Sequence, residues 1–367
     1  MMGCLFGRHL RRRIVASTCA LLGVLAVNLQ AHAERFDFVA LGDTAYNLPG
    51  DYPVYARLIE RINAAKPAFS IHVGDTWGAV PCNEDAHRNI LGWFARYQRP
   101  VVYTPGDNEW TDCRKPEVLQ TFGRVMAGQG TPQEKAELMR LRSLDSAFAG
   151  ESYGDVLGSL KLIRQVFFSE AKSLGAKPMS VVRQADVSEF KEMVENQRWM
   201  HSGVLFATVH VTGSGMGFTI NDAARANEAI ERNCANVAWL KAVFAEAQAT
   251  QSKAVVIALH AGMFEDADGG AFSNKALRGG DEGPYFWVAM ALRDLAATYG
   301  KPVLLINGDY HDLVIDRPFM VSQGEGKPPM YANITRVQVY GAPELKAVRI
   351  SVDTDTPWVF SYSPLYE

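Results

Sequence analysis

The sequence has no surplus of positive charge and little cysteine. Its 367 residues include 37 Lys and Arg against 40 Asp and Glu, for a net charge of -3. Broad binding to nucleic acid or to a membrane surface calls for a basic surplus, so we expect neither kind of partner. The sequence also has no internal repeat, low-complexity tract or linker composition. This absence favours one globular domain over an array of small ones.

The first 33 residues have the features of a secretory signal peptide. Arginines at 8 and 11–13 form a positive start, Ile14–Val27 is apolar, and Ala31-His32-Ala33 gives a small-x-small pattern before Glu34. The apolar run is short for a membrane span, so an uncleaved anchor helix is the less favoured alternative. We therefore expect a periplasmic or secreted protein, cleaved near Glu34, with no stable membrane anchor.

Six short apolar runs end in Asp or His, and four of them end in Gly-Asp. They are FDFVALGD ending at Asp43, FSIHVGD at Asp75, VVYTPGDNE at Asp107, VLFATVH at His210, VVIALH at His260, and VLLINGDYH at Asp309 and His311. Such runs suit buried strands, and ligands bind at the carboxyl ends of strands in open α/β sheets. One Gly-Asp alone is most often a turn, but the whole series predicts a metal site.

Helical patterns of crossover length separate these runs. Tyr55, Leu58, Ile59 and Ile62 share one face of a helix, and further helices are predicted over about 85–97, 222–247 and 286–298. This alternation predicts an α/β fold with parallel sheet. The C-terminal runs RVQVYG, AVRISVD and WVFSYS are separated only by turns, so we expect antiparallel sheet there.

The stretch from about 114 to 200 interrupts the alternation within the domain 34–367. Thr131-Pro132-Gln133-Glu134 has the N-cap, N1 proline and N3 glutamate of a helix start. We interpret the stretch as a mostly helical insertion that leaves from the loop after Asp107. It either caps the site and selects substrate or forms a structural layer, and both alternatives stay open.

Three cysteines remain once the signal peptide is removed. Cys234 falls in a helical apolar stripe with Val237 and Leu240, so we expect it to pack in the core. Cys82 and Cys113 follow two strand ends, and an oxidising compartment would permit a disulfide between them. Two unpaired thiols are the alternative, because a sequence does not show the geometry.

The chain resembles the calcineurin-like metallophosphoesterases from about residue 36 to 362. The matching motifs are Gly42-Asp43-Thr44-Ala45, Gly74-Asp75, Gly106-Asp107-Asn108-Glu109, His260 and Gly308-Asp309-Tyr310-His311. Segments such as YTPGDNEWTDC and HVTGS are similar to a secreted bacterial branch with degenerate motifs. The resemblance implies a four-layer α/β/β/α sandwich with a two-metal site at the strand ends.

The resemblance also implies which residues bind the two divalent ions. The ligands of the first ion would be Asp43, Asp75 and His311, and those of the second would be Asp75, Asp107, His260 and Asp309, with Asp75 bridging. A set of four carboxylates and two imidazoles favours Mn or Fe and leaves Zn open.

Two departures from the family pattern affect the chemistry. Ala45 stands where family members have a His ligand, so the first ion has three protein ligands unless Tyr46 or Asn47 reaches in. Asn108 stands where the family has its catalytic His. An Asn can donate a hydrogen bond but cannot transfer a proton near neutral pH.

The function implied is hydrolysis of a phosphate mono- or diester, with a small phosphate ester as the partner and a metal-bridging hydroxide as the nucleophile. Because Asn108 cannot act as a general acid, either substrates with good leaving groups are favoured or another residue donates the proton. His210 and Glu109 are the candidates for that role. The alternative is a degenerate, non-catalytic protein that binds metal or a phosphoryl ligand. That alternative would explain Ala45 and Asn108 together.

Overall fold

A computed structural model describes residues 35–78, 82–113, 120–121, 124–125, 128–145, 154–219, 221–264 and 284–366. All of them belong to one compact unit, 33–367, and the predicted signal peptide lies outside the described residues. The unit is mixed α/β, with two sheets and several helices, in agreement with the predicted class. No helix among the described residues is long and apolar enough to cross a bilayer.

The first sheet has the strand order β12-β11-β1-β2-β3. Its strands are β1 (Phe36–Leu41), β2 (Ser70–His72), β3 (Val101–Tyr103), β11 (Ala347–Val352) and β12 (Phe360–Leu365). Strands β1, β2 and β3 are parallel, whereas β11 is antiparallel to both β1 and β12. The predicted parallel βαβ units and the antiparallel addition by the last two runs are confirmed here.

The second sheet has the order β4-β5-β6-β7-β8-β10-β9. Its strands are β4 (Val182–Arg183), β5 (Gln197–His201), β6 (Val204–Thr208), β7 (Ala254–Ala258), β8 (Val303–Asn307), β9 (Val314–Asp316) and β10 (Ile334–Gln338). The expectation of antiparallel pairing is confirmed only in part for β10, which pairs antiparallel with β9 but parallel with β8. The apolar pattern of a strand shows that it is buried and does not specify its neighbour.

The helices occupy the connections between strands. They are α1 (Tyr52–Ala65), α2 (Glu84–Phe94), α4 (Pro132–Asp145), α5 (Val156–Phe167), α6 (Gln184–Val187), η1 (Ser214–Gly217), α7 (Ala223–Ala249) and α9 (Phe286–Tyr299). The predicted apolar face of α1 is buried as expected. Thr131 and Glu134 exchange the two hydrogen bonds of a capping box at the start of α4.

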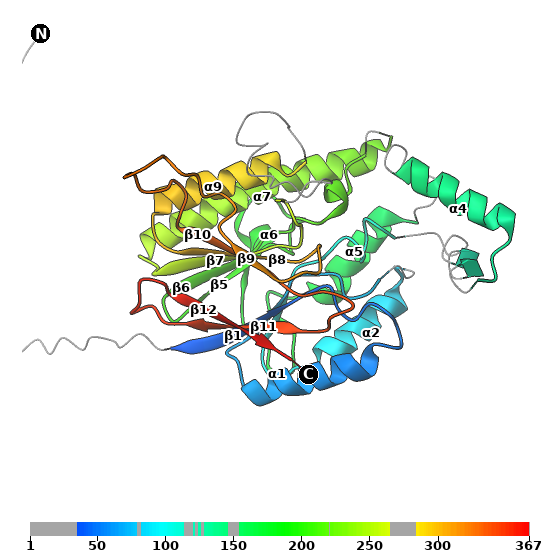
Figure 1. The fold of residues 1–367 in the computed structure, drawn as a ribbon, viewed down its shortest axis with the longest axis horizontal. Helices are drawn as coiled ribbons and strands as arrows, with labels where there is room; N and C mark the ends of the chain where they lie inside the picture. The colour runs from blue at the N-terminus through cyan, green and yellow to red at the C-terminus, as the bar shows by residue number, and fades with distance from the viewer. Residues whose placement is uncertain are drawn as a thin grey trace, which may run out of the picture. The chain divides into compact units, whose positions relative to one another are not determined.

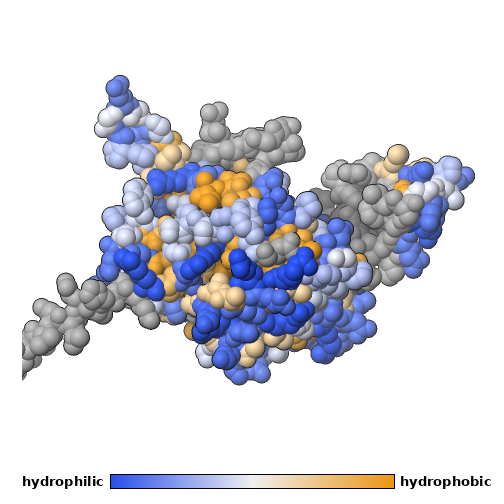
Figure 2. Space-filling view, turned by 60° about the horizontal axis from the view of Figure 1, so that its bottom comes forward, coloured by the Kyte–Doolittle hydropathy of each residue, from blue (hydrophilic) through white to orange (hydrophobic). Residues whose placement is uncertain are grey.

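The two sheets lie face to face (Figure 1), and apolar side chains of both fill the space between them. Phe38 and Ile71 of the first sheet share one buried cluster with Phe206 and Val256 of the second. The outer face of the second sheet is covered by α7 and α9, and the outer face of the first by α1, α2 and α5. On the face shown in Figure 2, polar surface surrounds separate apolar areas.

Within 114–200, the described residues include the helices α4, α5 and α6. They also include β4 and β5, which extend the second sheet and which the sequence interpretation did not anticipate. Whether the insertion caps the site stays a prediction.

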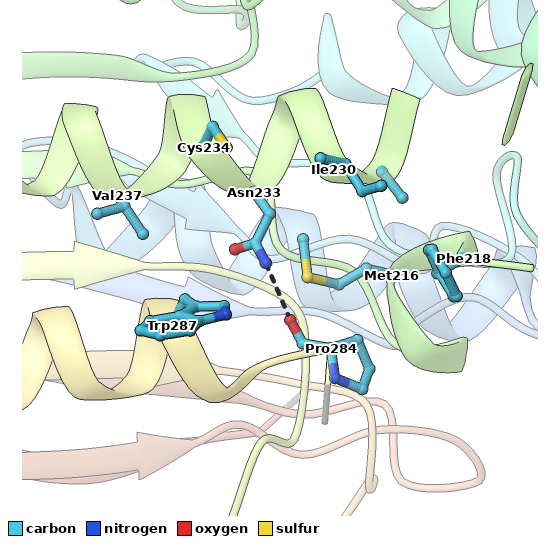
Figure 3. Close-up of a pocket in the computed structure, with 9 residues that line it drawn as sticks. Met216, Phe218, Ile230, Asn233, Cys234, Val237, Pro284 and Trp287 are labelled. Atoms are coloured by element: carbon cyan, nitrogen blue, oxygen red, sulfur yellow. Dashed lines mark hydrogen bonds between the residues drawn. The ribbon is translucent and has the colours of Figure 1, made fainter. Parts of the chain in front are cut away.

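The expectation that Cys234 packs in the core is wrong. Cys234 is exposed on α7 and lines an apolar pocket of about 620 Å³ between α7 and the start of α9 (Figure 3). Leu240, further along the same stripe, is buried. Ala229, Arg232 and Ala235, in the same turns of α7 as Cys234, are buried. Cys234 therefore lies at the edge of the buried face of α7, and a sequence pattern does not show how wide that face is.

Two buried histidines outside the strand-end series predict an acid sensitivity. Burial lowers the pKa of His72 in β2 to about 3 and that of His87 in α2 to about 4. In the unfolded chain both titrate near the ordinary value of about 6.5. The unfolded state therefore binds more protons, so the stability they contribute is complete above that value and is lost as pH falls toward the folded pKa.

Between about pH 7 and about pH 5 the free energy of unfolding of wild type should fall. We expect this fall to be about 1–2 kcal/mol smaller in His87→Gln, because Gln does not titrate. Denaturant unfolding of wild type and variant at the two pH values measures this difference. If the free energy of unfolding fell by the same amount in both proteins on acidification, His87 would not be held neutral in the fold.

Candidate metal centre

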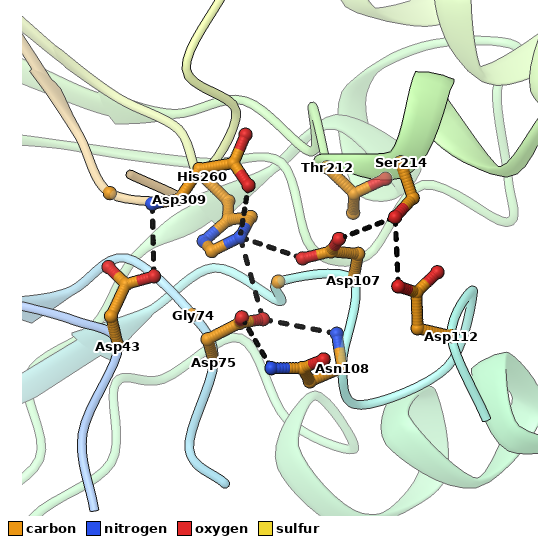
Figure 4. Close-up of polar contacts among 12 residues, drawn as sticks. Asp43, Gly74, Asp75, Asp107, Asn108, Asp112, Thr212, Ser214, His260 and Asp309 are labelled. Atoms are coloured by element: carbon orange, nitrogen blue, oxygen red, sulfur yellow. Dashed lines mark hydrogen bonds and ion pairs between the residues drawn. The ribbon is translucent and has the colours of Figure 1, made fainter. Parts of the chain in front are cut away.

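Five strand ends from the two sheets deliver the six predicted ligands to one place. The list is Asp43 after β1, Asp75 after β2, Asp107 after β3, His260 after β7, and Asp309 and His311 after β8. Figure 4 shows the side chains of Asp43, Asp75, Asp107, His260 and Asp309 directed toward one another. Two overlapping groups have ligand atoms within 4.8 Å of each other, namely Asp43, Asp75 and His260, and Asp107, His260 and Asp309.

The imidazole of His260 lies at the centre of the carboxylates. Its Nε2 is 2.9 Å from Asp107 Oδ1, 3.5 Å from Asp75 Oδ1 and 3.9 Å from Asp309 Oδ1. On the other side of the cluster, Nε2 of His311 is 3.6 Å from Asp43 Oδ1. These distances place three of the carboxylates around His260 and His311 beside Asp43. His311 is in neither of the two groups, so the assignment of His311 to the first ion stays a prediction.

Backbone carbonyls fix the tautomer of both histidines. Nδ1 of His260 donates to the carbonyl of Val73 at 2.7 Å, and Nδ1 of His311 donates to the carbonyl of Ala342 at 2.7 Å. In the neutral rings, Nε2 then carries the lone pair, and it faces the carboxylates. A lone pair and a carboxylate repel each other, so this arrangement calls for a proton or a metal ion between them.

Four of the six ligands have left-handed backbone conformations. The φ angles are 51° at Asp43, 54° at Asp75, 81° at Asp309 and 66° at His311. Non-glycine residues adopt such angles in only a few per cent of cases, and the strain concentrates at functional sites. The loops therefore turn sharply after the strands, and the turn directs the side chains inward.

Burial and mutual repulsion set the charge state of the carboxylates. Burial raises the pKa of Asp43 to about 7, and burial together with the Asp107 charge raises that of Asp75 well above its usual range. Burial also raises the pKa of Asp309. Burial acts to raise the pKa of Asp107 too, but the hydrogen bond and charge of His260 outweigh it and lower the pKa to about 2.

His260 itself shows the opposite balance. Burial lowers its pKa, but the carboxylates of Asp75, Asp107 and Asp43 more than reverse this, so the pKa lies well above the usual range. The cluster thus holds protons that a metal ion would displace, and metal binding should strengthen as pH rises.

The residues present fit a metal ion. Oδ2 of Asp43 is buried with no hydrogen-bond partner among the described residues, which is costly for a carboxylate unless a cation accompanies it. A Cβ on Gly308 would collide with that oxygen, and one on Gly213 would lie 2.6 Å from Asp309 Oδ1 and 2.8 Å from Asp107 Oδ2. The glycines leave space beside the carboxylates, and buried Asp and His clusters of this composition are typical of divalent-ion sites.

The three candidate catalytic residues lie in different settings. Asn108 is beside the ligands, where its backbone N–H donates to Asp75 Oδ1 at 3.1 Å and its side-chain amide donates to Asp75 Oδ2 at 2.7 Å. His210 is fully buried, with Nδ1 3.2 Å from Glu195 and its ring against Trp110. The contacts that define its position involve none of the six ligands.

Glu109 connects the two ligand loops of the first sheet. Its Oε1 accepts from the Thr76 N–H at 2.9 Å and from the Tyr103 hydroxyl at 3.0 Å, and its Oε2 accepts from the Gly106 N–H at 3.1 Å. With both oxygens in use and the side chain fully buried, Glu109 has the contacts of a residue that positions Asp75 and Asp107.

Two residues near the ligands were missed or left undecided by the sequence interpretation. Ser214 Oγ lies 2.8 Å from Asp107 Oδ2 and 2.9 Å from Asp112 Oδ2, and the only signal for it was the HVTGS segment after a strand. Tyr46 directs its hydroxyl at Asp75. Ala45, the position of the family's His, instead packs in the apolar cluster between the first sheet and its helices, with 2% of its surface exposed.

Several solved protein structures resemble the structure of this chain. No protein-family model and no curated protein matches the chain. A dimetal phosphatase from Danio rerio has 10% identity and a TM-score of 0.44 over 90% of this chain and 98% of its own. The structure of PhoD has 10% identity and a TM-score of 0.44 over 88% of this chain and 65% of its own.

A third structure, GAP50, the anchor in the inner membrane complex of Plasmodium, has 9% identity and a TM-score of 0.41 over 90% of this chain and 89% of its own. Likenesses at these identities and scores carry no argument about function. The function is therefore argued from the residues of the site.

The structure pairs Cys82 with Cys113, which confirms the predicted disulfide. The bond joins the loop after Asp75 to the loop after Asp107, between residues 31 positions apart in the chain. Sγ of Cys82 also lies 3.4 Å from the carbonyl of Asn108. The disulfide therefore restrains the same two loops that Glu109 connects.

We expect the double substitution Cys82→Ser and Cys113→Ser to lower the free energy of unfolding by roughly 3 kcal/mol, because a loop of this size is released in the unfolded chain. Metal affinity should fall as well, since two ligand loops lose a restraint. Denaturant unfolding and calorimetric metal titration measure the two effects. Cys234→Ser is the matched control and should change neither, and an unaltered double variant would show that the disulfide does not support the site.

Proposed function

We propose that the chain is an exported, metal-dependent phosphoesterase that hydrolyses a phosphate mono- or diester. The observation that carries the proposal is the pair of overlapping Asp and His groups that share His260, with ligand atoms within 4.8 Å. We further propose that the fold is the four-layer metallophosphoesterase sandwich. The face-to-face sheets, with helices on both outer faces, support this assignment.

The site would hold two divalent ions, with Mn or Fe favoured and Zn open. When bound, such a pair supplies Lewis-acid polarisation of a phosphoryl oxygen and a water of lowered pKa. The first ion would be held by Asp43, Asp75 and His311, and the second by Asp75, Asp107, His260 and Asp309. Asp75, whose Oδ1 is 3.5 Å from the His260 Nε2 that the two groups share, would bridge the ions and set their spacing.

The other polar residues of the site position these ligands. Asn108 holds both oxygens of Asp75 by hydrogen bonds, and Ser214 contacts Asp107 Oδ2. His260 and His311 direct Nε2 at the carboxylates in a fixed orientation, because Nδ1 of each ring donates to a backbone carbonyl. The geometry is therefore set before any ion binds, which favours tight and specific coordination.

Proton donation to the leaving group has no evident source among the candidates. Asn108 cannot supply a proton, the oxygens of Glu109 are occupied by three donors, and His210 is buried against Glu195. Burial also lowers the pKa of His210 below its usual value. We propose that Glu109 and His210 position the loops, and that the enzyme acts on esters whose leaving groups need little protonation.

We expect Asp75→Asn to remove both ions and all hydrolysis, because the substitution removes the negative charge and one of the two oxygens of the bridging position while nearly keeping its size. Elemental analysis of metal content, paired with a screen of phosphate monoesters and diesters, measures both. Asp186→Asn, at an exposed carboxylate paired with Arg183, is the control and should match wild type. A variant that keeps both ions would contradict the bridging role of Asp75, and wild type that binds two ions without turnover would favour the non-catalytic alternative.

The absence of a general acid predicts a steep dependence on the leaving group. Wild type should hydrolyse aryl esters with acidic leaving groups far faster than alkyl esters, by about the 10²- to 10⁴-fold that general acid catalysis contributes. Asn108→His should raise the rate for alkyl esters more than for aryl esters. Steady-state rates across a leaving-group series measure the slope, and a flat series for wild type would show that another residue donates the proton.

A further inference from the structure

In the loop after β1, the side chains of two neighbouring residues point in opposite directions. Ala45 is buried among Leu41, Tyr55 and Trp77 in the cluster outside the first sheet, so its side chain points away from the ligands. Tyr46 points the other way, into the carboxylate cluster. The position that aligns with the family's imidazole therefore cannot contribute a ligand, whereas the next position can.

The Tyr46 hydroxyl lies among three groups of the first metal position. It is 2.5 Å from Asp75 Oδ2, 3.2 Å from His311 Nε2 and 2.7 Å from the Asn108 amide nitrogen. The ring of Tyr46 packs edge-on against that of His311, with centroids 4.8 Å apart. These contacts fix the phenol oxygen within the ligand cluster and keep it from swinging out into solvent.

The hydrogen bonds around this oxygen leave one acceptor over. Asn108 donates to it, while Asp75 Oδ2 and the His311 Nε2 both face it. The hydroxyl proton can serve only one of these two atoms, so the other is available to a further partner such as a metal ion.

The spacing matches that of neighbouring ligands on one ion. Ligand atoms about 2.0–2.2 Å from a metal and roughly at right angles are about 3 Å apart, and Tyr46 Oη lies 3.2 Å from His311 Nε2. The Asp43 Oδ1 atom lies 3.6 Å from the same His311 Nε2. The Tyr46 hydroxyl and the Asp43 carboxylate therefore both lie beside His311 Nε2, and the same hydroxyl contacts Asp75 Oδ2.

We propose that Tyr46 is the fourth protein ligand of the first metal ion and takes the place of the imidazole that Ala45 cannot provide. The proposal rests on the proposed function. As the ion binds, the O–H bond of Tyr46 breaks, its proton leaves to solvent, and the phenolate oxygen bonds to the metal. The first ion then has Asp43, Asp75, His311 and Tyr46, so three of its four ligands are anionic oxygens.

An anionic oxygen in place of an imidazole alters metal preference. Imidazole suits Zn, while oxygen ligands suit harder ions such as Mn. The first position should therefore select Mn over Zn more strongly than a position with two imidazoles would. This selectivity provides a measurement that does not depend on turnover.

The test compares Tyr46→Phe, Tyr46→His and Ala45→His with wild type. Calorimetric titration with Mn²⁺ and with Zn²⁺ gives the number of ions and each affinity, near-ultraviolet difference absorption detects a metal-bound phenolate, and thermal melting checks folding. Tyr46→Phe should weaken the first ion by about 10- to 100-fold, by analogy with the loss of groups that orient a ligand. It should leave the second ion in place and abolish the phenolate signal.

The two histidine substitutions separate the two positions. Tyr46→His should restore the first ion and shift its preference toward Zn²⁺, because an imidazole then faces the site. Ala45→His should not strengthen metal binding and should lower the melting temperature, because it places an imidazole in an apolar cluster.

Three results would overturn the proposal. They are a folded Tyr46→Phe that binds both ions at wild-type affinity, a wild-type protein that binds two ions without a phenolate signal, and a gain of metal affinity in Ala45→His. Wild type that binds no divalent ion at all would instead overturn the proposed function. The two failures are therefore distinguishable.

Discussion

The repulsion among four buried carboxylates is the constraint on which the rest of the site depends. Asp43, Asp75, Asp107 and Asp309 lie within reach of one imidazole, and burial alone acts to raise the pKa of each. Isolated buried carboxylates would destabilise a fold by several kcal/mol each. The cluster is tolerable only if cations, as protons or as metal ions, compensate it, and this need for positive charge is the physical basis of the proposed metal site.

The fold keeps these charges together through restraints outside the cluster. Parallel strands deliver the residues to one edge, and left-handed turns at four of the ligands point the side chains inward. Glu109 and the Cys82–Cys113 disulfide then join the loops after β2 and β3. Both restraints act on the loops and leave the ligand atoms free, so the chain can hold a repulsive cluster in place and keep it open to an ion.

The sequence predicted the parts of the structure that local patterns determine. Burial on both faces gives a strand a continuous apolar run, and the Asp or His at its end was visible for the same reason. The face of α1 and the capping box at Thr131 were equally local. The loop after β1 was not, because packing against α1 and α2 decides that Ala45 faces the core and Tyr46 the ligands. The contacts of Glu109 also depend on a donor that lies 33 positions away in the chain, and β10 pairs with a neighbour that its own pattern does not specify.

The two departures from the family pattern have different consequences once the geometry is known. The missing imidazole at Ala45 has a neighbour, Tyr46, whose oxygen lies beside Asp75 and His311. In our proposal the first ion therefore keeps four protein ligands, with a phenolate oxygen in place of an imidazole nitrogen. The missing histidine at Asn108 has no such substitute, because Glu109 and His210 are held by other partners. Under the proposed function, this chain would keep the ability to bind metal and lack a residue that donates a proton to the leaving group. A site that binds metal ions but has no general acid could still stabilise a pentacoordinate phosphorus. The leaving-group oxygen would then depart without a proton and with a negative charge. Such a site selects substrates by the acidity of the leaving group, before any contact with the rest of the molecule contributes.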